Sequence, residues 1–289
     1  MSRVYRALEK AEEEKKERGK PEAPLRIFRE RETPEREAPV REGPGRDGPV
    51  VKFPEEKVER LELPRREELS VLIPPINSYA AEEFRKLKTQ VFMRFPHPPC
   101  TLLVTSAAPE EGKTTVSVNL AFAISRELNK KAILIDADLR SPSIFPENLS
   151  NNTGLSGYLS GKGGFEEILH QDGTENLLII PAGPSTSRST ELIGSKRMGE
   201  LLSSLHNHEK DAYVIIDCSP IISTSEPVML SKMVDGVVLV VMAGKTPKES
   251  VKRAFKSIDQ QKVVGVVLNQ IDIKQSSYYS KYHYEYYKK

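Results

Sequence analysis

Ser106-Ala-Ala-Pro-Glu-Glu-Gly-Lys-Thr-Thr115 follows a short apolar run, Leu102–Thr105, and precedes an amphipathic stretch. The pattern A-x4-G-K-T between a strand and a helix predicts a loop whose backbone N–H groups, together with the helix N-terminus, surround phosphates. The ammonium of Lys113 would reach the β- and γ-phosphates, and the hydroxyl of Thr114 would bind Mg²⁺. The residues expected to contact the nucleotide are Ala108, Pro109, Glu110, Glu111, Gly112, Lys113, Thr114 and Thr115.

Two further motifs have aspartates at the ends of apolar runs. Asp136 follows Ile133-Leu-Ile, with Asp138 two residues on, and Asp217 follows Tyr213-Val-Ile-Ile. Ligands of open α/β sheets bind at the carboxyl ends of the strands, where carboxylates can hold Mg²⁺ or accept a proton from an attacking hydroxyl. A lone aspartate at a strand end often only caps the next helix, but the three motifs together favour a catalytic site.

Short apolar runs alternate with amphipathic segments along the central part of the chain. Most of these runs are continuously apolar, which is typical of strands buried on both faces. Their alternation with helices predicts an α/β fold of the P-loop class, with a mostly parallel central sheet flanked by helices. The predicted strands are Leu102–Thr105, Ala132–Ile135, Leu177–Ile180, Tyr213–Ile216, Val237–Met242 and Val263–Leu268.

Residues 1–75 differ from the rest of the chain in composition. They contain 18 basic and 18 acidic side chains and ten of the 21 prolines. Such a segment buries too little apolar surface to offset its ordering entropy, so we expect it to be largely disordered. Within it, residues 2–18 are predicted to form a short helix, either solvated or a docking peptide for a partner. The catalytic domain is then expected over residues 76–272.

A second helix is predicted from Tyr79 to Phe95, with Asn77 or Ser78 as its cap. Acidic residues near its start and lysines further along suit the helix dipole. Its apolar stripe is formed by Phe84, Leu87 and Val91.

The last twelve residues contain six of the ten tyrosines of the chain. Lysines and a histidine break up this cluster, and nothing in it repeats with a core-facing period. Beside a nucleotide-binding core, a flexible tail over residues 273–289 suggests phosphoryl acceptors carried by the same chain. The candidate acceptors are Tyr278, Tyr279, Tyr282, Tyr284, Tyr286 and Tyr287.

Composition excludes several classes of partner and location. The net charge of +2 provides no global basic field, so no nucleic-acid partner is expected. No apolar run approaches the ~20 residues that span a bilayer, and the N-terminus has no signal-peptide core. Cys100 and Cys218 are too few and too far apart in sequence to suggest a disulfide framework or a zinc site. We expect a cytoplasmic protein that reaches the inner face of the cell membrane through a partner.

These motifs together resemble those of the bacterial tyrosine autokinases of capsule and exopolysaccharide synthesis, which share the MinD/ParA-like P-loop fold. The resemblance covers about residues 70–289. Separately, residues 1–10 of the chain resemble the start of the subgroup found in exosortase-associated (PEP-CTERM) polysaccharide loci. It implies a non-specific protein-tyrosine kinase that uses ATP and Mg²⁺ to phosphorylate its tail in trans. Through this reaction it would regulate polysaccharide synthesis and export.

The resemblance also implies a role for each matched residue. Lys113 binds phosphates, Asp136 is the candidate base for the incoming tyrosine, and Arg140 completes the same Asp136-Ala-Asp-Leu-Arg140 catalytic motif. Asn269, at the end of the matching stretch Gly265–Asn269, would contact the nucleotide. The residues implied to organise the metal are Thr114, Asp138 and Asp217.

Three kinds of partner follow from the resemblance. The helix motif that builds a ring homo-oligomer in relatives appears here as Glu82, Arg85 and Lys88, so each tail would enter the active site of a neighbouring copy. A membrane-embedded chain-length or adaptor protein would activate the kinase. A protein tyrosine phosphatase would reverse the reaction.

Some positions depart from the family pattern. Glu110 replaces a frequent loop glycine, and Lys88 keeps the charge of the usual arginine but loses its bidentate fork. Ser189-Thr190 stands where Asn-Pro is common, and Glu226 stands where aspartate is common.

Two alternative functions remain open. The first is a positioning ATPase of the MinD/ParA type, a class that uses a lysine near the start of the phosphate loop. Ala108 occupies that position here, which argues against this class. The second is a nucleotide-dependent scaffold of a polysaccharide-export complex. The sequence argues less strongly against it than against the positioning ATPase, because a scaffold of this kind needs the same nucleotide motifs.

Overall fold

The computed structural model describes residues 74, 78–142, 144, 154–171 and 176–271. The predicted helix over residues 2–18 and the six candidate acceptor tyrosines lie outside the described residues, and so does the segment 1–75 predicted to be disordered, apart from Pro74. These predictions therefore stay predictions.

A seven-stranded sheet forms the centre of the described chain, with strand order β3-β4-β2-β5-β1-β6-β7. Neighbouring strands are parallel except β3 and β4, which are antiparallel. The predicted α/β fold with a mostly parallel sheet is confirmed, and each of the six predicted strands is present; β3, only two residues long, was not predicted. The strands are β1 (Cys100–Ser106), β2 (Lys131–Asp136), β3 (His170–Gln171), β4 (Leu177–Ile180), β5 (Ala212–Asp217), β6 (Gly236–Met242) and β7 (Val263–Asn269).

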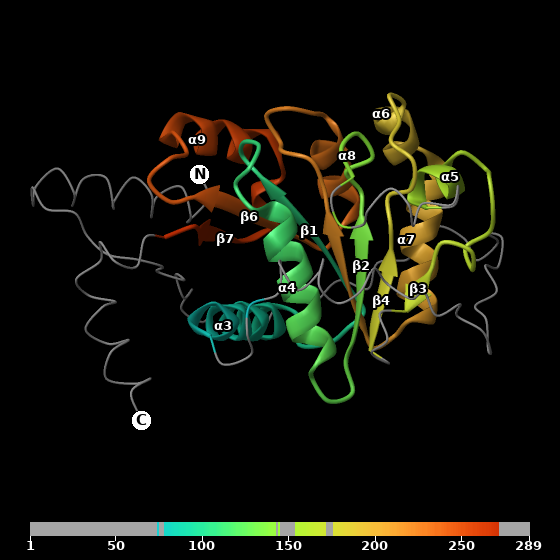
Figure 1. The fold of residues 1–289 in the computed structure, drawn as a ribbon, viewed down its shortest axis with the longest axis horizontal. Coiled ribbons are helices and arrows are strands. Elements are labelled where there is room, and N and C mark those ends of the chain that lie inside the picture. The colour runs from blue at the N-terminus through green and yellow to red at the C-terminus, as the bar shows by residue number, and fades with distance from the viewer. Residues whose placement is uncertain (1–73, 75–77, 143, 145–153, 172–175, 272–289) are drawn as a thin grey trace, which may run out of the picture.

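Helices cover both faces of this sheet, as Figure 1 shows. Side chains alternate between the two faces along a strand, so Leu102 joins one buried cluster and Leu103 the other. Helices α3 and α4 pack on the face of Leu102, while residues of α5 to α9 pack on the face of Leu103. The helices are α3 (Tyr79–Arg94), α4 (Lys113–Ser125), α5 (Leu155–Leu159), α6 (Ser189–Ile193), α7 (Lys196–His208), α8 (Glu226–Met233) and α9 (Lys248–Ser257), with a short 3-10 turn, η2 (Gln260–Lys262).

Helix α3 lies close to its predicted position and ends one residue earlier, at Arg94. The hydroxyl of Ser78 accepts a hydrogen bond from the N–H of Ala81 at 3.2 Å, so Ser78 is the cap. Behind the helix, the hydroxyl of the fully buried Tyr213 donates to the carbonyl of Phe95 at 2.7 Å. The C-terminus of α3 is therefore fastened to the central strand β5.

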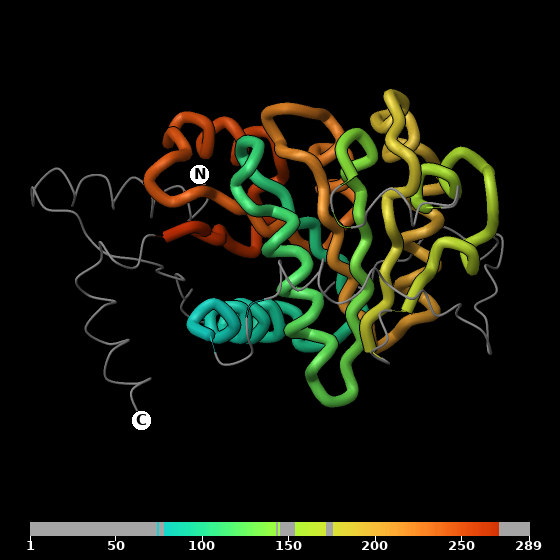
Figure 2. The backbone as a smooth tube through the Cα atoms, viewed as in Figure 1, coloured from blue at the N-terminus to red at the C-terminus, as the bar shows by residue number. Residues whose placement is uncertain are grey.

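The carboxyl ends of β1, β2 and β5 meet at one edge of the sheet. In the strand register Asp136 of β2 pairs with Asp217 of β5, and Asp217 pairs in turn with Val104 of β1. Figure 2 shows the loops that follow these strands together along the upper edge. The three sequence motifs are therefore brought side by side by the parallel topology alone.

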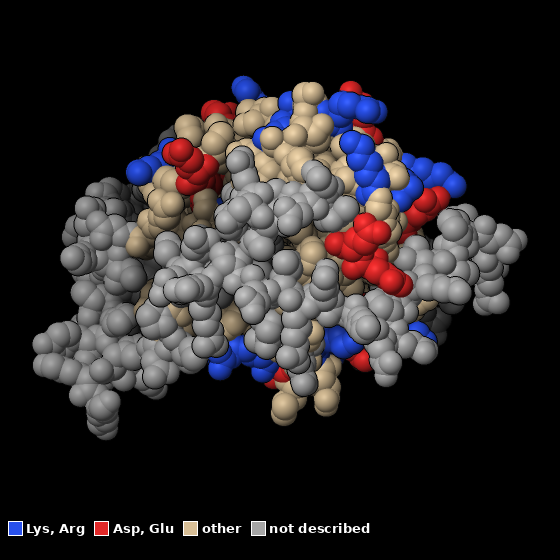
Figure 3. Space-filling model, turned by 45° about the vertical axis from the view of Figure 1, so that its right-hand side comes forward, with Lys and Arg blue, Asp and Glu red and all other residues tan. Residues whose placement is uncertain are grey.

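The surface of the described residues carries both signs of charge. On the face in Figure 3, basic and acidic side chains are interspersed over the part that these residues form. No helix among the described residues has the length and apolar character that a membrane span requires.

Replacement of glycine by alanine is expected to change the free energy of unfolding in opposite directions at two positions. A Cβ at Gly154 would lie 2.3 Å from the backbone nitrogen of Gly183, whereas a Cβ at Gly199 in α7 would meet nothing within 4 Å. We expect Gly154→Ala to lower the free energy of unfolding by about 3 kcal/mol, because backbone must move. Gly199→Ala should raise it by about 0.5–1 kcal/mol, because alanine favours the helix. Urea denaturation of both variants tests this, and effects of the same sign would contradict it.

Candidate active site

The loop between β1 and α4 is bent by two residues in left-handed backbone conformation, Glu110 (φ 62°) and Gly112 (φ 86°). A Cβ at Gly112 would lie 2.1 Å from the amide nitrogen of Asn269, so glycine is required there. Glu110, in the position of the frequent family glycine, adopts a conformation that glycine accepts more easily. With the neighbouring Pro109, it forms the exposed tip of the loop.

Side chains from inside the protein brace this loop. The carboxylate of Glu111 is 2% exposed, and it accepts hydrogen bonds from the N–H of Ala108 at 2.8 Å and from the hydroxyl of Thr246. The amide of Asn269 donates to the carbonyl of Glu111 at 2.9 Å. The side chains of Glu111 and Asn269, both expected at the nucleotide, therefore hold the shape of the loop. Thr246 was not predicted, and no motif marks it.

Helix α4 begins at Lys113, directly after the loop. The first N–H groups of a helix have no partner within it, and they carry the positive end of its dipole. With the curved loop in front of them, they form a cradle suited to phosphate. Lys113, Thr114 and Thr115 lie in this first turn, and their contacts with a nucleotide stay predictions.

A lysine ammonium and two carboxylates meet beside this cradle. The Nζ of Lys113 lies 3.1 Å from Oδ2 of Asp138 and 4.0 Å from Oδ2 of Asp217. Asp217 is fully buried, and it accepts hydrogen bonds from the hydroxyls of Thr114 at 2.7 Å and Ser117 at 2.9 Å. Ser117 was not predicted, although its position one helical turn after Thr114 could have identified it.

The protonation equilibria of this cluster reflect burial and mutual charge. Burial by itself would lower the pKa of Lys113, but the carboxylates of Asp217 and Asp138 raise it above its ordinary value. Burial raises the pKa of Asp217, although Lys113 and the hydroxyl of Thr114 oppose the shift. The carboxylates outnumber the nearby ammonium, so the cluster has capacity for a further cation.

Asp136 is turned toward the backbone of its own loop. Its carboxylate, 1% exposed, accepts hydrogen bonds from the N–H groups of Asp138 at 3.1 Å and Ile144 at 3.3 Å. These bonds fix the turn that directs Asp138 toward Lys113. The role of Asp136 as a base stays a prediction.

Arg140 lies in a second polar network. Its guanidinium donates to Oε1 of Glu226 at 2.9 Å and to the hydroxyl of Thr190 at 3.0 Å. Glu226 also accepts hydrogen bonds from the hydroxyls of Ser189 at 2.5 Å and Thr190 at 3.0 Å. These contacts join Arg140 to α6 and α8, so its expected catalytic role stays a prediction. The two separate departures from the family pattern, at Ser189-Thr190 and Glu226, are in direct contact.

The three residues expected at an oligomer interface lie on α3. Arg85 pairs with Glu82 at 2.7 Å, one helical turn away, and Lys88 pairs with Glu127 beyond the end of α4. Their charges are thus paired within the chain in this structure.

The donor set fits a magnesium ion that arrives with a nucleotide. Within the described part of the chain, no three His, Cys, Asp or Glu side chains group closely enough to hold a metal by themselves. Mg²⁺ in phosphoryl-transfer sites, however, is usually held by one or two carboxylates together with substrate phosphates. Thr114, Asp138 and Asp217 provide a hydroxyl and two carboxylates beside the phosphate cradle.

Known proteins resemble this chain over the same region. Residues 110–270 match the family model described as an AAA domain. Tyrosine-protein kinase YwqD of Bacillus subtilis (strain 168) is 32% identical over 212 residues, which cover 71% of this chain and 87% of that protein. The crystal structure of the chimerical protein CapA2B2 is 30% identical, covers 68% of this chain and 86% of its own, and has a TM-score of 0.62. The cell division ATPase MinD of Pyrococcus furiosus shares the fold, with 18% identity over 65% of this chain and 80% of its own and a TM-score of 0.51.

The raised pKa of Asp217 predicts a pH-dependent cost to stability. The folded protein binds a proton at this carboxyl more tightly than the unfolded chain does, so this contribution to stability falls as pH rises above the ordinary value of 3.8. The substitution Asp217→Asn removes the titrating carboxyl and with it this pH-dependent contribution. Without nucleotide or Mg²⁺, the variant should therefore gain in free energy of unfolding relative to wild type as pH rises. Parallel urea denaturation between about pH 5 and about pH 8 measures this, and a difference independent of pH would contradict it.

The lowered pKa of Glu226 predicts that its contribution to stability depends on pH in the opposite direction. Burial would raise its pKa, but hydrogen bonds from Ser189 and Arg140 outweigh burial and lower the pKa to about 2. Its stabilising contribution is present above the ordinary value of 4.5 and is lost as pH falls toward about 2. We expect Glu226→Gln to cost about 2 kcal/mol at neutral pH. The same denaturation measurements should show this cost shrinking in acid, and a cost that grows in acid would refute the account.

Proposed function

The chain belongs to the family of bacterial tyrosine-protein kinases with a MinD-like P-loop fold, and from this we propose that it phosphorylates its own C-terminal tyrosines in trans. The phosphoryl donor would be ATP bound with Mg²⁺. The proposed acceptors are Tyr278, Tyr279, Tyr282, Tyr284, Tyr286 and Tyr287.

One observation carries this proposal: a phosphate cradle, a lysine and buried aspartates meet at a single edge of the sheet. Lys113 and Thr114 begin the helix that faces the phosphates, and Asp138 and Asp217 lie within 4.0 Å of the ammonium. Phosphoryl transfer requires mainly positioning and charge stabilisation. The described residues would supply both, and the tyrosine-rich tail would supply the acceptors.

The reaction assigns a task to each group. The phenolic oxygen of a tyrosine would bond to the γ-phosphorus while the bond from that phosphorus to the β–γ bridging oxygen breaks, so that ADP leaves. Lys113 would stabilise the charge on the phosphate oxygens. Asp136 would accept the phenolic proton. When bound, Mg²⁺ would neutralise charge on the β- and γ-phosphates, held by Thr114, Asp138 and Asp217.

Transfer in trans requires that two copies meet. Glu82, Arg85 and Lys88 would contact a neighbouring copy in a ring, which requires their present pairs to open or to extend across the interface. Phosphorylated tails would carry more negative charge and loosen the ring. A protein tyrosine phosphatase would return the tails to their starting state.

A membrane-embedded chain-length or adaptor protein is the proposed activator. The similarity to the chimerical protein CapA2B2 supports a kinase that works joined to a second protein. The kinase would then lie at the cytoplasmic face of the membrane and regulate capsule or exopolysaccharide synthesis. Its first ten residues support the exosortase-associated subgroup.

The direct test is incubation of the purified full-length chain with Mg·ATP, followed by phosphopeptide mass spectrometry. We expect phosphotyrosine in the tail. Lys113→Met should reduce it at least about 100-fold, because a charge-stabilising group is lost. The exposed Lys162→Met is the matched control, and it should retain wild-type activity.

Mixing two variants tests transfer between copies. A chain with Lys113→Met but an intact tail should become phosphorylated by a chain in which the six tail tyrosines are phenylalanine. Absence of tail phosphotyrosine in the wild type, even with an activator peptide present, would refute the proposal. Turnover to ADP without phosphotyrosine would instead favour the nucleotide-dependent scaffold.

A further inference from the structure

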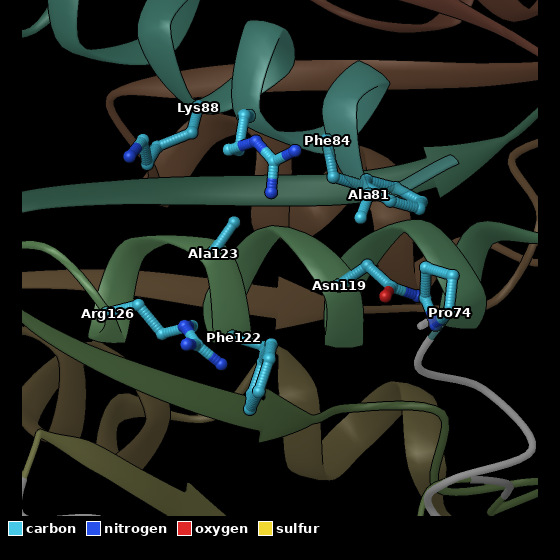
Figure 4. A pocket seen from close by; sticks show the side chains of 9 residues that line it. Pro74, Ala81, Phe84, Lys88, Asn119, Phe122, Ala123 and Arg126 are labelled. Atoms are coloured by element: carbon cyan, nitrogen blue, oxygen red, sulfur yellow. The ribbon is translucent and has the colours of Figure 1, made fainter. Parts of the chain in front are cut away.

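A groove of about 230 Å³ lies between α3 and α4, on the face of the sheet that carries the phosphate-loop helix. Figure 4 shows Phe84 above it on α3 and Phe122 below it on α4, with Ala81 and Ala123 nearby. Phe84 and Phe122 pack against the buried cluster but remain partly exposed. The two rings form an apolar lining of the groove.

Basic side chains border this lining. Lys88 is paired with Glu127, and Arg85 is paired with Glu82. Arg126 lies over the ring of Phe122, 5.5 Å from its centroid, and makes no ion pair with another described residue. An occupant that complements the groove therefore combines aliphatic side chains with a carboxylate.

The sequence has such a segment directly at the groove. Pro74 lines one end, beside Asn119 in Figure 4. The residues that lead into it are Glu67-Glu68-Leu69-Ser70-Val71-Leu72-Ile73, with four aliphatic side chains and two carboxylates. We propose that residues 67–73 of the same chain occupy the groove, with their aliphatic side chains against Phe84 and Phe122 and a carboxylate at Arg126.

Chain length permits this arrangement. Ala81 and Lys88 are seven residues apart on α3, which corresponds to about 10 Å along a helix. An extended chain advances about 3.3 Å per residue, so three or four residues before Pro74 cover that length. Glu68 lies six residues before Pro74, far enough along to meet the guanidinium of Arg126 at the opposite end of the groove.

Docking of residues 67–73 would affect assembly. The groove is built partly from α3, which also carries Glu82, Arg85 and Lys88. If the proposed ring is correct, residues 67–73 and a neighbouring copy compete for one helix. Docking of the segment would then hold the kinase in a state with less contact between copies. The docking itself does not depend on the proposed kinase reaction.

Disulfide trapping in the full-length protein tests the docking. Cys100 and Cys218 are both buried, and burial raises the pKa of each thiol, so introduced cysteines should be the reactive ones. The test pair is Ser70→Cys with Ala123→Cys. The control pair is Ser70→Cys with Ser203→Cys, an exposed position on α7 across the sheet.

We expect the test pair to form a disulfide within one chain at least about tenfold faster than the control pair, because docking raises the effective concentration of the thiols. Adding Glu67→Lys and Glu68→Lys should slow the reaction, and Arg126→Glu should restore its rate. Equal rates for the test and control pairs would overturn the proposal. Disulfide-linked dimers that increase with protein concentration would also overturn it, because a second copy would then occupy the groove.

Discussion

The attraction between Lys113 and the carboxylates of Asp138 and Asp217 is the interaction on which the rest of the site depends. Each group comes from a different segment: the first turn of α4, the loop after β2 and the end of β5. A buried carboxylate is costly unless it is paired or hydrogen-bonded, so the lysine and the hydroxyls of Thr114 and Ser117 make the cluster tolerable before a nucleotide arrives. The same ammonium is the proposed partner of the phosphates. Nucleotide binding would therefore exchange one set of anionic partners of Lys113 for another, and a metal cation would compensate the carboxylates that the lysine leaves.

The sequence predicts those features that follow from local pattern. Runs such as Tyr213–Ile216 are apolar because both faces of a central parallel strand are buried. The aspartates directly after these runs are recognisable as candidate site residues because ligands bind at the carboxyl ends of the strands. The parallel register then brings Asp136 beside Asp217 without further information. Strand β3 could not be predicted in this way, because its two residues are too few to establish a period. The contact of Thr246 with Glu111 joins positions 135 residues apart, and no motif marks it.

Departures from a family pattern are more informative in pairs than singly. Ser189-Thr190 and Glu226 looked like unrelated substitutions in sequence, yet both hydroxyls donate to the one carboxylate that also accepts from Arg140. The longer glutamate side chain is matched by two hydroxyl donors, which makes a joint change of the three positions physically reasonable. One carboxylate oxygen, Oε2 of Glu226, is buried without a hydrogen-bond partner among the described residues. The network therefore retains an acceptor that a further donor would satisfy.

The bracing of the phosphate loop bears on how such a kinase is controlled. Glu111, Asn269 and the left-handed Gly112 hold the loop in its curved form through contacts within the protein. A site that is preorganised in this way gains little from further ordering by a regulator. Regulation then acts more effectively on the delivery of the acceptor than on the assembly of the catalytic groups. Helix α3 is suited to that role, because it is fastened to the core through Phe95 and Tyr213 while its outer side borders an apolar groove that either the chain itself or another protein can fill.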